Sequence, residues 1–130
     1  MATVVIGYVP KPEGDAALLA GIEEAQRRSA RAVVVHAMLD HEEDEPAYVG
    51  EVRSVLDHSG VDHDLRVLDR GVEASDGLIG VAEEVEAELI VIGLRRRSPV
   101  GKLILGTNAQ RVMLDAPCPV LTVKPRAGRH

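Results

Sequence analysis

The stretch LIVIGLRRRSPVGKLILGT, residues 89–107, decides how this chain folds. Its first five residues, Leu89–Gly93, form an apolar run that is typical of a strand buried on both faces of a parallel sheet. Its last two, Gly106 and Thr107, open a pattern that predicts a helix as far as Leu114. Between strand and helix stand four cationic side chains and no acidic one. A loop of this kind is where an open α/β sheet binds an anion, and we expect the phosphate of a nucleotide.

Strand and helix patterns alternate along the rest of the chain. Apolar, β-branched runs predict the strands, and apolar residues three or four apart predict the helices. This alternation predicts an α/β fold, a Rossmann-like open parallel five-stranded sheet with helices on both faces. Polar and apolar residues alternate in the predicted strand Asp62–Arg70, the third along the chain, and this alternation predicts a place near a sheet edge. The other predicted strands are Thr3–Val9, Arg31–Met38, Asp62–Arg70 and Val120–Val123, and the other predicted helices are Gly14–Ser29, Ala47–His58 and Ala74–Ala87.

The length and composition indicate one domain. A chain of 130 residues, of which 45% are hydrophobic, suits a single core over residues 1–125, followed by a flexible C-terminal tail at 126–130. No apolar stretch approaches the roughly 18 residues of a membrane span, and no signal peptide opens the chain. We therefore expect a cytoplasmic protein with no membrane partner.

The charge distribution restricts the partners further. The net charge is −6, but residues 1–88 carry twenty acidic and seven basic side chains, whereas residues 89–114 carry five basic and none acidic. An acidic body repels nucleic acid, and a chain with two Tyr, no Phe and no Trp offers few faces on which bases could stack. We expect no nucleic acid partner, and the basic segment favours a small polyanion.

The basic loop has the chemistry that phosphate binding needs. One arginine side chain can bind two phosphate oxygens at once. The first N–H groups of a helix carry partial positive charge, and the missing Cβ of Gly93 permits close approach of a ligand. Three alternatives stay open: a solvated arginine run, a Gly106 that serves helix–sheet packing, and a Thr107 that only caps the helix. The candidate binding residues of the loop are Gly93, Arg95, Arg96, Lys102, Gly106, Thr107 and Asn108.

Catalytic and metal-binding patterns are weak. Ser98 lacks the Gly-x-Ser-x-Gly setting of a hydrolase nucleophile, and no general base stands out. The histidines lack the i, i+4 spacing of a metal-binding helix, and the acidic run Asp40–Glu45 lacks an EF-hand pattern. Cys118, the single cysteine, cannot form an intramolecular disulfide and suits a buried structural position. We expect no catalytic residue and no metal site.

Two motifs carry a family resemblance. Gly93, Gly106 and Thr107 match a pattern of Gly, two residues, Gly, nine residues, Gly and then Ser or Thr, with Arg96 in the place of the second glycine. The segment Ala116–Val120 reads APCPV and leads into the last strand. On these residues the chain resembles the universal stress protein family over essentially its whole length, and in particular the branch that binds nucleotides.

The resemblance implies both an architecture and a ligand. It implies strand order 3-2-1-4-5 and ATP, with Mg²⁺ recruited by the phosphates, bound where strands one and four diverge. The adenine would lie near Val9, Pro10 and Ala37, and the phosphates would meet the motif loop. A regulatory role in the stress response is implied rather than an enzymatic one, together with a homodimer paired through Val120–Val123. A short apolar edge strand invites such pairing, unless the tail covers it.

Two departures from the family pattern leave the ligand open. ATP-binding members often carry Asp where this chain has Val9, and Arg96 either crowds the phosphate path or supplies charge itself. The leading interpretation is a dimeric regulatory module that binds ATP or a related nucleotide or phosphate ligand. The alternative is a protein-interaction module of the same fold without nucleotide, and a slow nucleotide hydrolase is a third.

Overall fold

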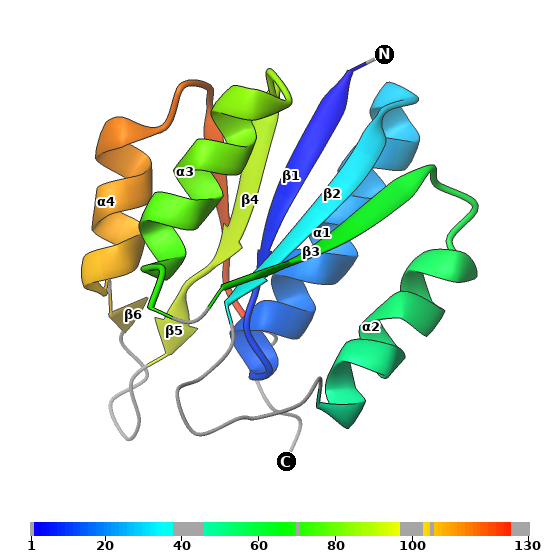
Figure 1. Cartoon of the computed structure of the whole chain (residues 1–130), viewed down its shortest axis with the longest axis horizontal. Coiled ribbons are helices and arrows are strands. Elements are labelled where there is room, and N and C mark those ends of the chain that lie inside the picture. The colour runs from blue at the N-terminus through cyan, green and yellow to red at the C-terminus, as the bar shows by residue number, and fades with distance from the viewer. Residues whose placement is uncertain (1, 38–45, 70, 97–102, 105, 126–130) are drawn as a thin grey trace.

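A five-stranded parallel sheet forms the centre of the molecule, with strand order β3-β2-β1-β4-β7 (Figure 1). The structure is a computed structural model that describes residues 2–37, 46–69, 71–96, 103–104 and 106–125. The predicted order 3-2-1-4-5 is confirmed, because β7 is the fifth strand of this sheet. The strands of the sheet are β1 (Thr3–Tyr8), β2 (Arg31–Ala37), β3 (His63–Leu68), β4 (Leu89–Gly93) and β7 (Val120–Val123). The helices are α1 (Pro12–Arg28), α2 (Ala47–Asp57), α3 (Ala74–Glu84) and α4 (Thr107–Asp115).

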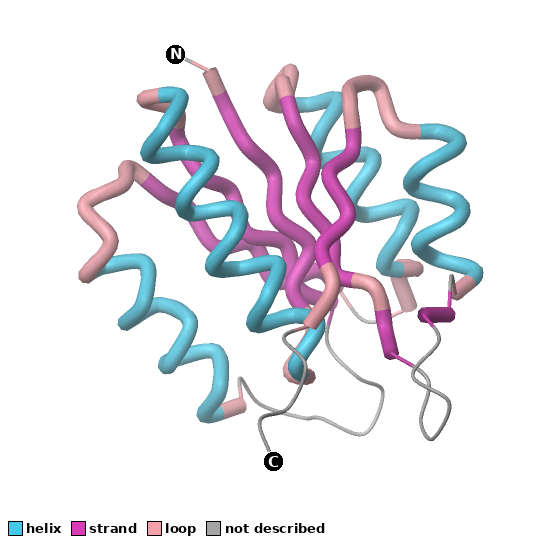
Figure 2. Tube along the Cα trace, turned by 180° about the vertical axis from the view of Figure 1, so that it is seen from behind, coloured by secondary structure: helices cyan, strands magenta, loops and turns pink. Residues whose placement is uncertain are grey.

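Helices cover both faces of the sheet, as the alternation of elements predicts. Figure 2 shows α1 and α2 on the near face, with α3 and α4 behind the sheet. Along β1, Val4 and Ile6 pack toward α1 and α2, whereas Val5 packs toward α3 and α4. Successive side chains of a strand point to opposite faces, so a strand covered on both sides must be apolar at consecutive positions. This is why β1, β2 and β4 are apolar at consecutive positions through their centres.

Helix ends differ from the sequence prediction by a few residues. The helix expected from Gly14 begins at Pro12, because proline has the φ of a helix and lacks only an N–H that the first turn leaves unpaired. The helix expected to reach Ala87 ends at Glu84, and Glu86 takes a left-handed φ of 53°. A non-glycine residue in that region marks the end of a helix.

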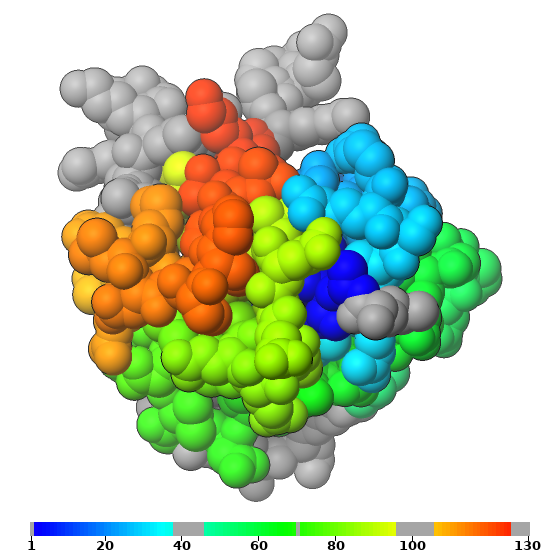
Figure 3. All heavy atoms as spheres, turned by 90° about the horizontal axis from the view of Figure 1, so that it is seen from above, coloured from blue at the N-terminus to red at the C-terminus, as the bar shows by residue number. Residues whose placement is uncertain are grey.

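The sheet edges are β3 and β7, and both are partly exposed along their whole length. The polar–apolar alternation of β3 therefore predicted its place correctly. Figure 3 looks down on the amino-terminal ends of the strands, where the start of β1 (dark blue) lies between the segments that lead into β2 (light blue) and β4 (yellow-green).

Cys118 is half-buried just before β7, and burial raises the pKa of its thiol.

The segment after β4 contains two short strands that the sequence did not predict. β5 (Arg95–Arg96) and β6 (Leu103–Ile104) pair antiparallel, with Arg95 opposite Ile104. The expected loop is therefore a hairpin whose stem is described. The acidic run at 40–45 and the expected tail at 126–130 lie outside the described residues.

Candidate functional site

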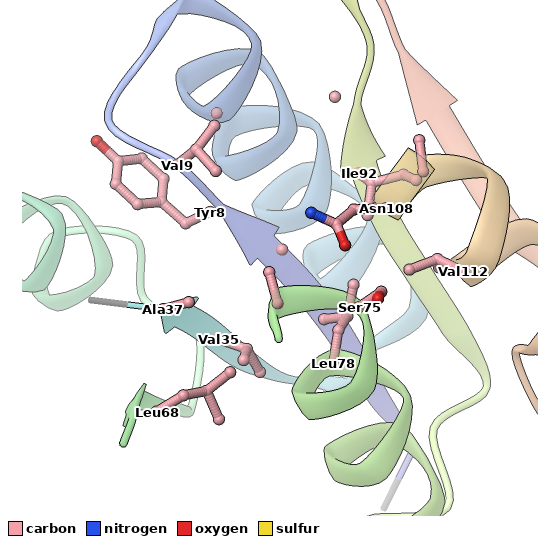
Figure 4. A pocket seen from close by; sticks show the side chains of 15 residues that line it. Tyr8, Val9, Val35, Ala37, Leu68, Ser75, Leu78, Ile92, Asn108 and Val112 are labelled. Carbon is pink, nitrogen blue, oxygen red and sulfur yellow. The ribbon is translucent and has the colours of Figure 1, made fainter. Parts of the chain in front are cut away.

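A pocket of about 160 Å³ opens at the carboxyl edge of the sheet, on the face covered by α3 and α4 (Figure 4). Its position follows from topology, because β1 and β4 are neighbours and the chain leaves β1 toward β2 but leaves β4 toward β7. Open α/β sheets bind ligands in the crevice that this divergence creates. The walls are apolar where Val35, Leu78, Ile92 and Val112 extend the core to the surface.

The residues expected around an adenine lie partly in this pocket. Val9 and Ala37 line it, at the carboxyl ends of the two central strands β1 and β2. Pro10 is exposed and does not line the pocket. Gly7, on the neighbouring stretch of β1, leaves room between Ile92 and Leu78, since a Cβ at this position would stand 3.2 Å from both Ile92 Cγ2 and Leu78 Cδ2.

The residues expected around phosphate gather at the start of α4. Asn108 lines the pocket, and Figure 4 shows its amide directed into it. Gly106 is the N-cap of α4 and Thr107 its exposed first residue, and no side chain caps the helix. Thr107 is therefore not the N-cap, and the capping alternative was wrong.

The packing alternative for Gly106 also fails within the described part of the chain. Gly106 has an ordinary φ of −66°, and a Cβ there would meet no described atom within 4 Å. Neither backbone conformation nor a close neighbour therefore requires a glycine. The space beside the first N–H groups of α4 is open, and such groups favour anions.

Gly93 lines the pocket, but contact with the protein's own main chain, rather than with a ligand, explains why this residue is a glycine. A Cβ at Gly93 would collide with the main-chain carbonyl of Glu13 in the first turn of α1. Gly14 is under the same constraint, against the carbonyl of Val9. These two glycines let α1 start directly against the ends of β1 and β4. The expectation that Gly93 is a glycine for the sake of a ligand is corrected accordingly.

The cations of the loop do not form the described pocket wall. Arg95 is exposed on β5, Arg96 lies beside it on the same strand, and Lys102 is outside the described residues. No described residue that lines the pocket is charged. Arg111 of α4 pairs with Asp76 of α3 at 2.9 Å and so links the two helices that border the pocket.

The model of the universal stress protein family matches residues 1–124. A universal stress protein of Mycolicibacterium smegmatis is 44% identical, over 94% of this chain and 97% of the relative.

The chain belongs to the universal stress protein family. A universal stress protein structure from Archaeoglobus fulgidus has a TM-score of 0.77 and 34% identity, and covers 95% of this chain and 98% of its own. A structure of the universal stress protein from the same organism in complex with dAMP has a TM-score of 0.74 and 29% identity over the same shares. The fold that the resemblance implied is thus established.

Ser75 is a member of the pocket wall that the sequence analysis missed. It is 2% exposed, and it lies in the first turn of α3 beside Ala74, which also lines the pocket. A signal was present, because Ser75 is three residues before the apolar Leu78 and so lies on the same face of the predicted helix. A polar residue on the buried face of a helix of this family is worth marking even where no charge stands near it.

The opposite face of the same sheet edge is held by an aromatic cluster. His36 is buried, with Nε2 2.9 Å from the Tyr48 hydroxyl and Nδ1 3.4 Å from the Tyr8 carbonyl oxygen. The Tyr8 hydroxyl donates to Asp15 at 3.4 Å, and burial, followed by the Asp15 charge, raises the pKa of Tyr8 to about 12. These contacts tie the ends of β1 and β2 to α1 and α2.

Within the described ranges, no three His, Cys, Asp or Glu side chains are placed to share a metal ion. None of the helices in this part of the chain is both long and apolar enough to span a bilayer.

Proposed function

We propose that this chain is a regulatory module that binds ATP or a related nucleotide in the pocket at the carboxyl edge of the sheet. The observation that carries the proposal is a cavity of about 160 Å³ with apolar walls that reaches the uncapped first turn of α4. A heterocyclic base suits such walls, and a phosphate suits a helix start. The relative in complex with dAMP, which matches 95% of this chain, supports the assignment.

The base would occupy the end of the pocket nearest β2. There Val9 and Ala37 offer apolar surface rather than a carboxylate, so the base is held chiefly by shape and burial. Val9 in the place of the aspartate that ATP-binding members often carry weakens polar recognition at this point. This departure favours a ligand whose affinity depends strongly on its phosphates.

The phosphates would lie against Gly106, Thr107 and Asn108. Main-chain N–H groups, the Thr107 hydroxyl and the Asn108 amide all donate, and Arg95, Arg96 and Lys102 would add positive charge from the hairpin. Mg²⁺, where ATP brings it, would be held mainly by phosphate oxygens. The role is binding rather than turnover, since the described wall offers neither a carboxylate nor a histidine as a general base.

Regulation would pass through the two helices that border the pocket. A ligand between α3 and α4 acts on the pair of helices that Arg111 and Asp76 already join. We further propose a cytoplasmic homodimer paired through β7, whose outer edge has no partner strand among the described residues.

Calorimetry with ATP, AMP and adenosine tests the proposal. We expect ATP to bind, and Thr107→Ala to weaken ATP severalfold while adenosine binding stays unchanged. Light scattering on the same samples tests the dimer, and a monomer at micromolar concentration would remove that part. Absence of binding across all three ligands would leave the protein-interaction module, which the uncharged pocket wall and Val9 also suit.

A further inference from the structure

Ser75 is the buried hydroxyl of the pocket. It is 2% exposed and makes no side-chain hydrogen bond with any residue that the structure describes. Every fully buried polar side-chain atom among those residues has a partner, so the Ser75 hydroxyl is not sealed in the core but meets the pocket. A hydroxyl that meets a pocket and has no partner within the protein is free to hydrogen-bond a ligand bound there.

The position of Ser75 along α3 determines how deep in the pocket its hydroxyl lies, and so which part of a ligand it would contact. Leu78, one turn further along α3, contacts the inner end of the pocket, where a Cβ on Gly7 would touch it. Ser75 therefore stands one turn nearer the mouth on the same helix face. Asn108 stands in the same relation to Val112 on α4, and Figure 4 shows its amide in the middle of the pocket, with Ser75 on the side of α3 nearer to α4.

The surroundings of Ser75 suit a ring rather than a phosphate. The side chains drawn nearest to it in Figure 4 are apolar, Leu78 on the same helix and Val112 of α4. One hydroxyl among apolar groups matches the edge of a flat heterocycle, which needs a few well-placed hydrogen bonds. A phosphate needs several donors and positive charge, and these lie at the start of α4.

We propose that the Ser75 hydroxyl hydrogen-bonds the heterocyclic base of the bound nucleotide and so selects a ligand with a polar ring edge. This inference rests on the proposed function and adds the residue that reads the base. Serine can both donate and accept, so Ser75 can meet a ring nitrogen or an exocyclic amine. In this chain it would supply base recognition at a site where Val9 offers none.

NMR titration of the intact chain with adenine, adenosine and AMP tests the proposal. Ser75→Ala removes one oxygen, Ser75→Cys keeps the volume but hydrogen-bonds weakly, and Ser54→Ala changes an exposed serine of α2 as the matched control. We expect both Ser75 variants to weaken all three ligands by the same factor, about threefold to tenfold, and the control to change none. Melting curves of the ligand-free variants should overlay that of the parent chain.

The outcomes separate this inference from the proposed function. If the parent chain binds AMP and both Ser75 variants bind it equally well, the role of Ser75 is overturned and nucleotide binding stands. A loss seen with AMP and adenosine but not with adenine would place the hydroxyl against the sugar, which also overturns it. If the parent chain binds neither these three ligands nor ATP, the proposed function fails first. If Ser75→Ala does not fold, the affinity of Ser75→Cys alone tests whether the Ser75 hydroxyl contributes to binding.

Discussion

Gly93→Ala should destabilise the fold strongly, because the new Cβ would collide with the Glu13 main-chain carbonyl. Backbone atoms stand on both sides of this contact, so no flexible side chain can move aside. Overpacking of a tight interior costs about 1–3 kcal/mol even where side chains can adjust. We expect a loss in the free energy of unfolding at or above about 3 kcal/mol, which is a large part of the roughly 5–15 kcal/mol of a typical domain.

Gly106→Ala is the matched control within the same motif. Its Cβ would meet no described atom and its φ of −66° suits alanine, so the gain of about 0.4–1 kcal/mol from a stiffer unfolded chain is offset by the poorer N-cap, and we expect the free energy of unfolding to stay within about 1 kcal/mol of that of the parent chain. Urea titration followed by far-UV circular dichroism measures both variants against the parent chain. Equal stability of Gly93→Ala and the parent would refute the packing reason for Gly93. Unfolding of Gly106→Ala would refute the claim that its surroundings are open.

Three further results are expected. Gly106→Ala should weaken ATP in calorimetry, because the methyl group enters the space beside the first N–H groups of α4. Gly7→Ala should fold but bind nucleotide less tightly, since its Cβ at 3.2 Å from Leu78 and Ile92 narrows the pocket; unchanged affinity would place the base elsewhere. Tyr8 should ionise near pH 12 in absorbance titration, and because its pKa is raised on folding, the stabilisation it gives should be complete below about pH 10 and fall as pH rises through 12.

The fold could be predicted from the sequence because both faces of the sheet are covered. A strand covered on both faces is apolar at consecutive positions, and in β1 Val4 and Ile6 belong to one core layer while Val5 belongs to the other. The β5–β6 hairpin could not be predicted in this way. Each of its strands has two residues, which is too few to show a period, and its pairing joins positions on either side of a loop.

The candidate site could be predicted less completely, and for a different reason. The cationic loop carried an obvious chemical signal, so Thr107 and Asn108 were marked, whereas Ser75 lay in a helix that showed only apolar periodicity. The pocket joins the ends of several elements that are far apart in the chain. A hydroxyl becomes a ligand group only through that tertiary arrangement, which periodicity within one helix does not reveal.

The two motif glycines show why a glycine pattern alone does not define a phosphate site. Gly93 and Gly106 match the same motif, yet Gly93 is constrained by the carbonyl of Glu13, a residue of another element, and Gly106 is constrained by no described neighbour. A glycine that the fold requires would persist in a chain that had lost its ligand. A glycine that nothing in the described fold requires is the better indicator of binding. On this argument Gly106, rather than Gly93, is the position whose substitution should separate nucleotide binding from stability.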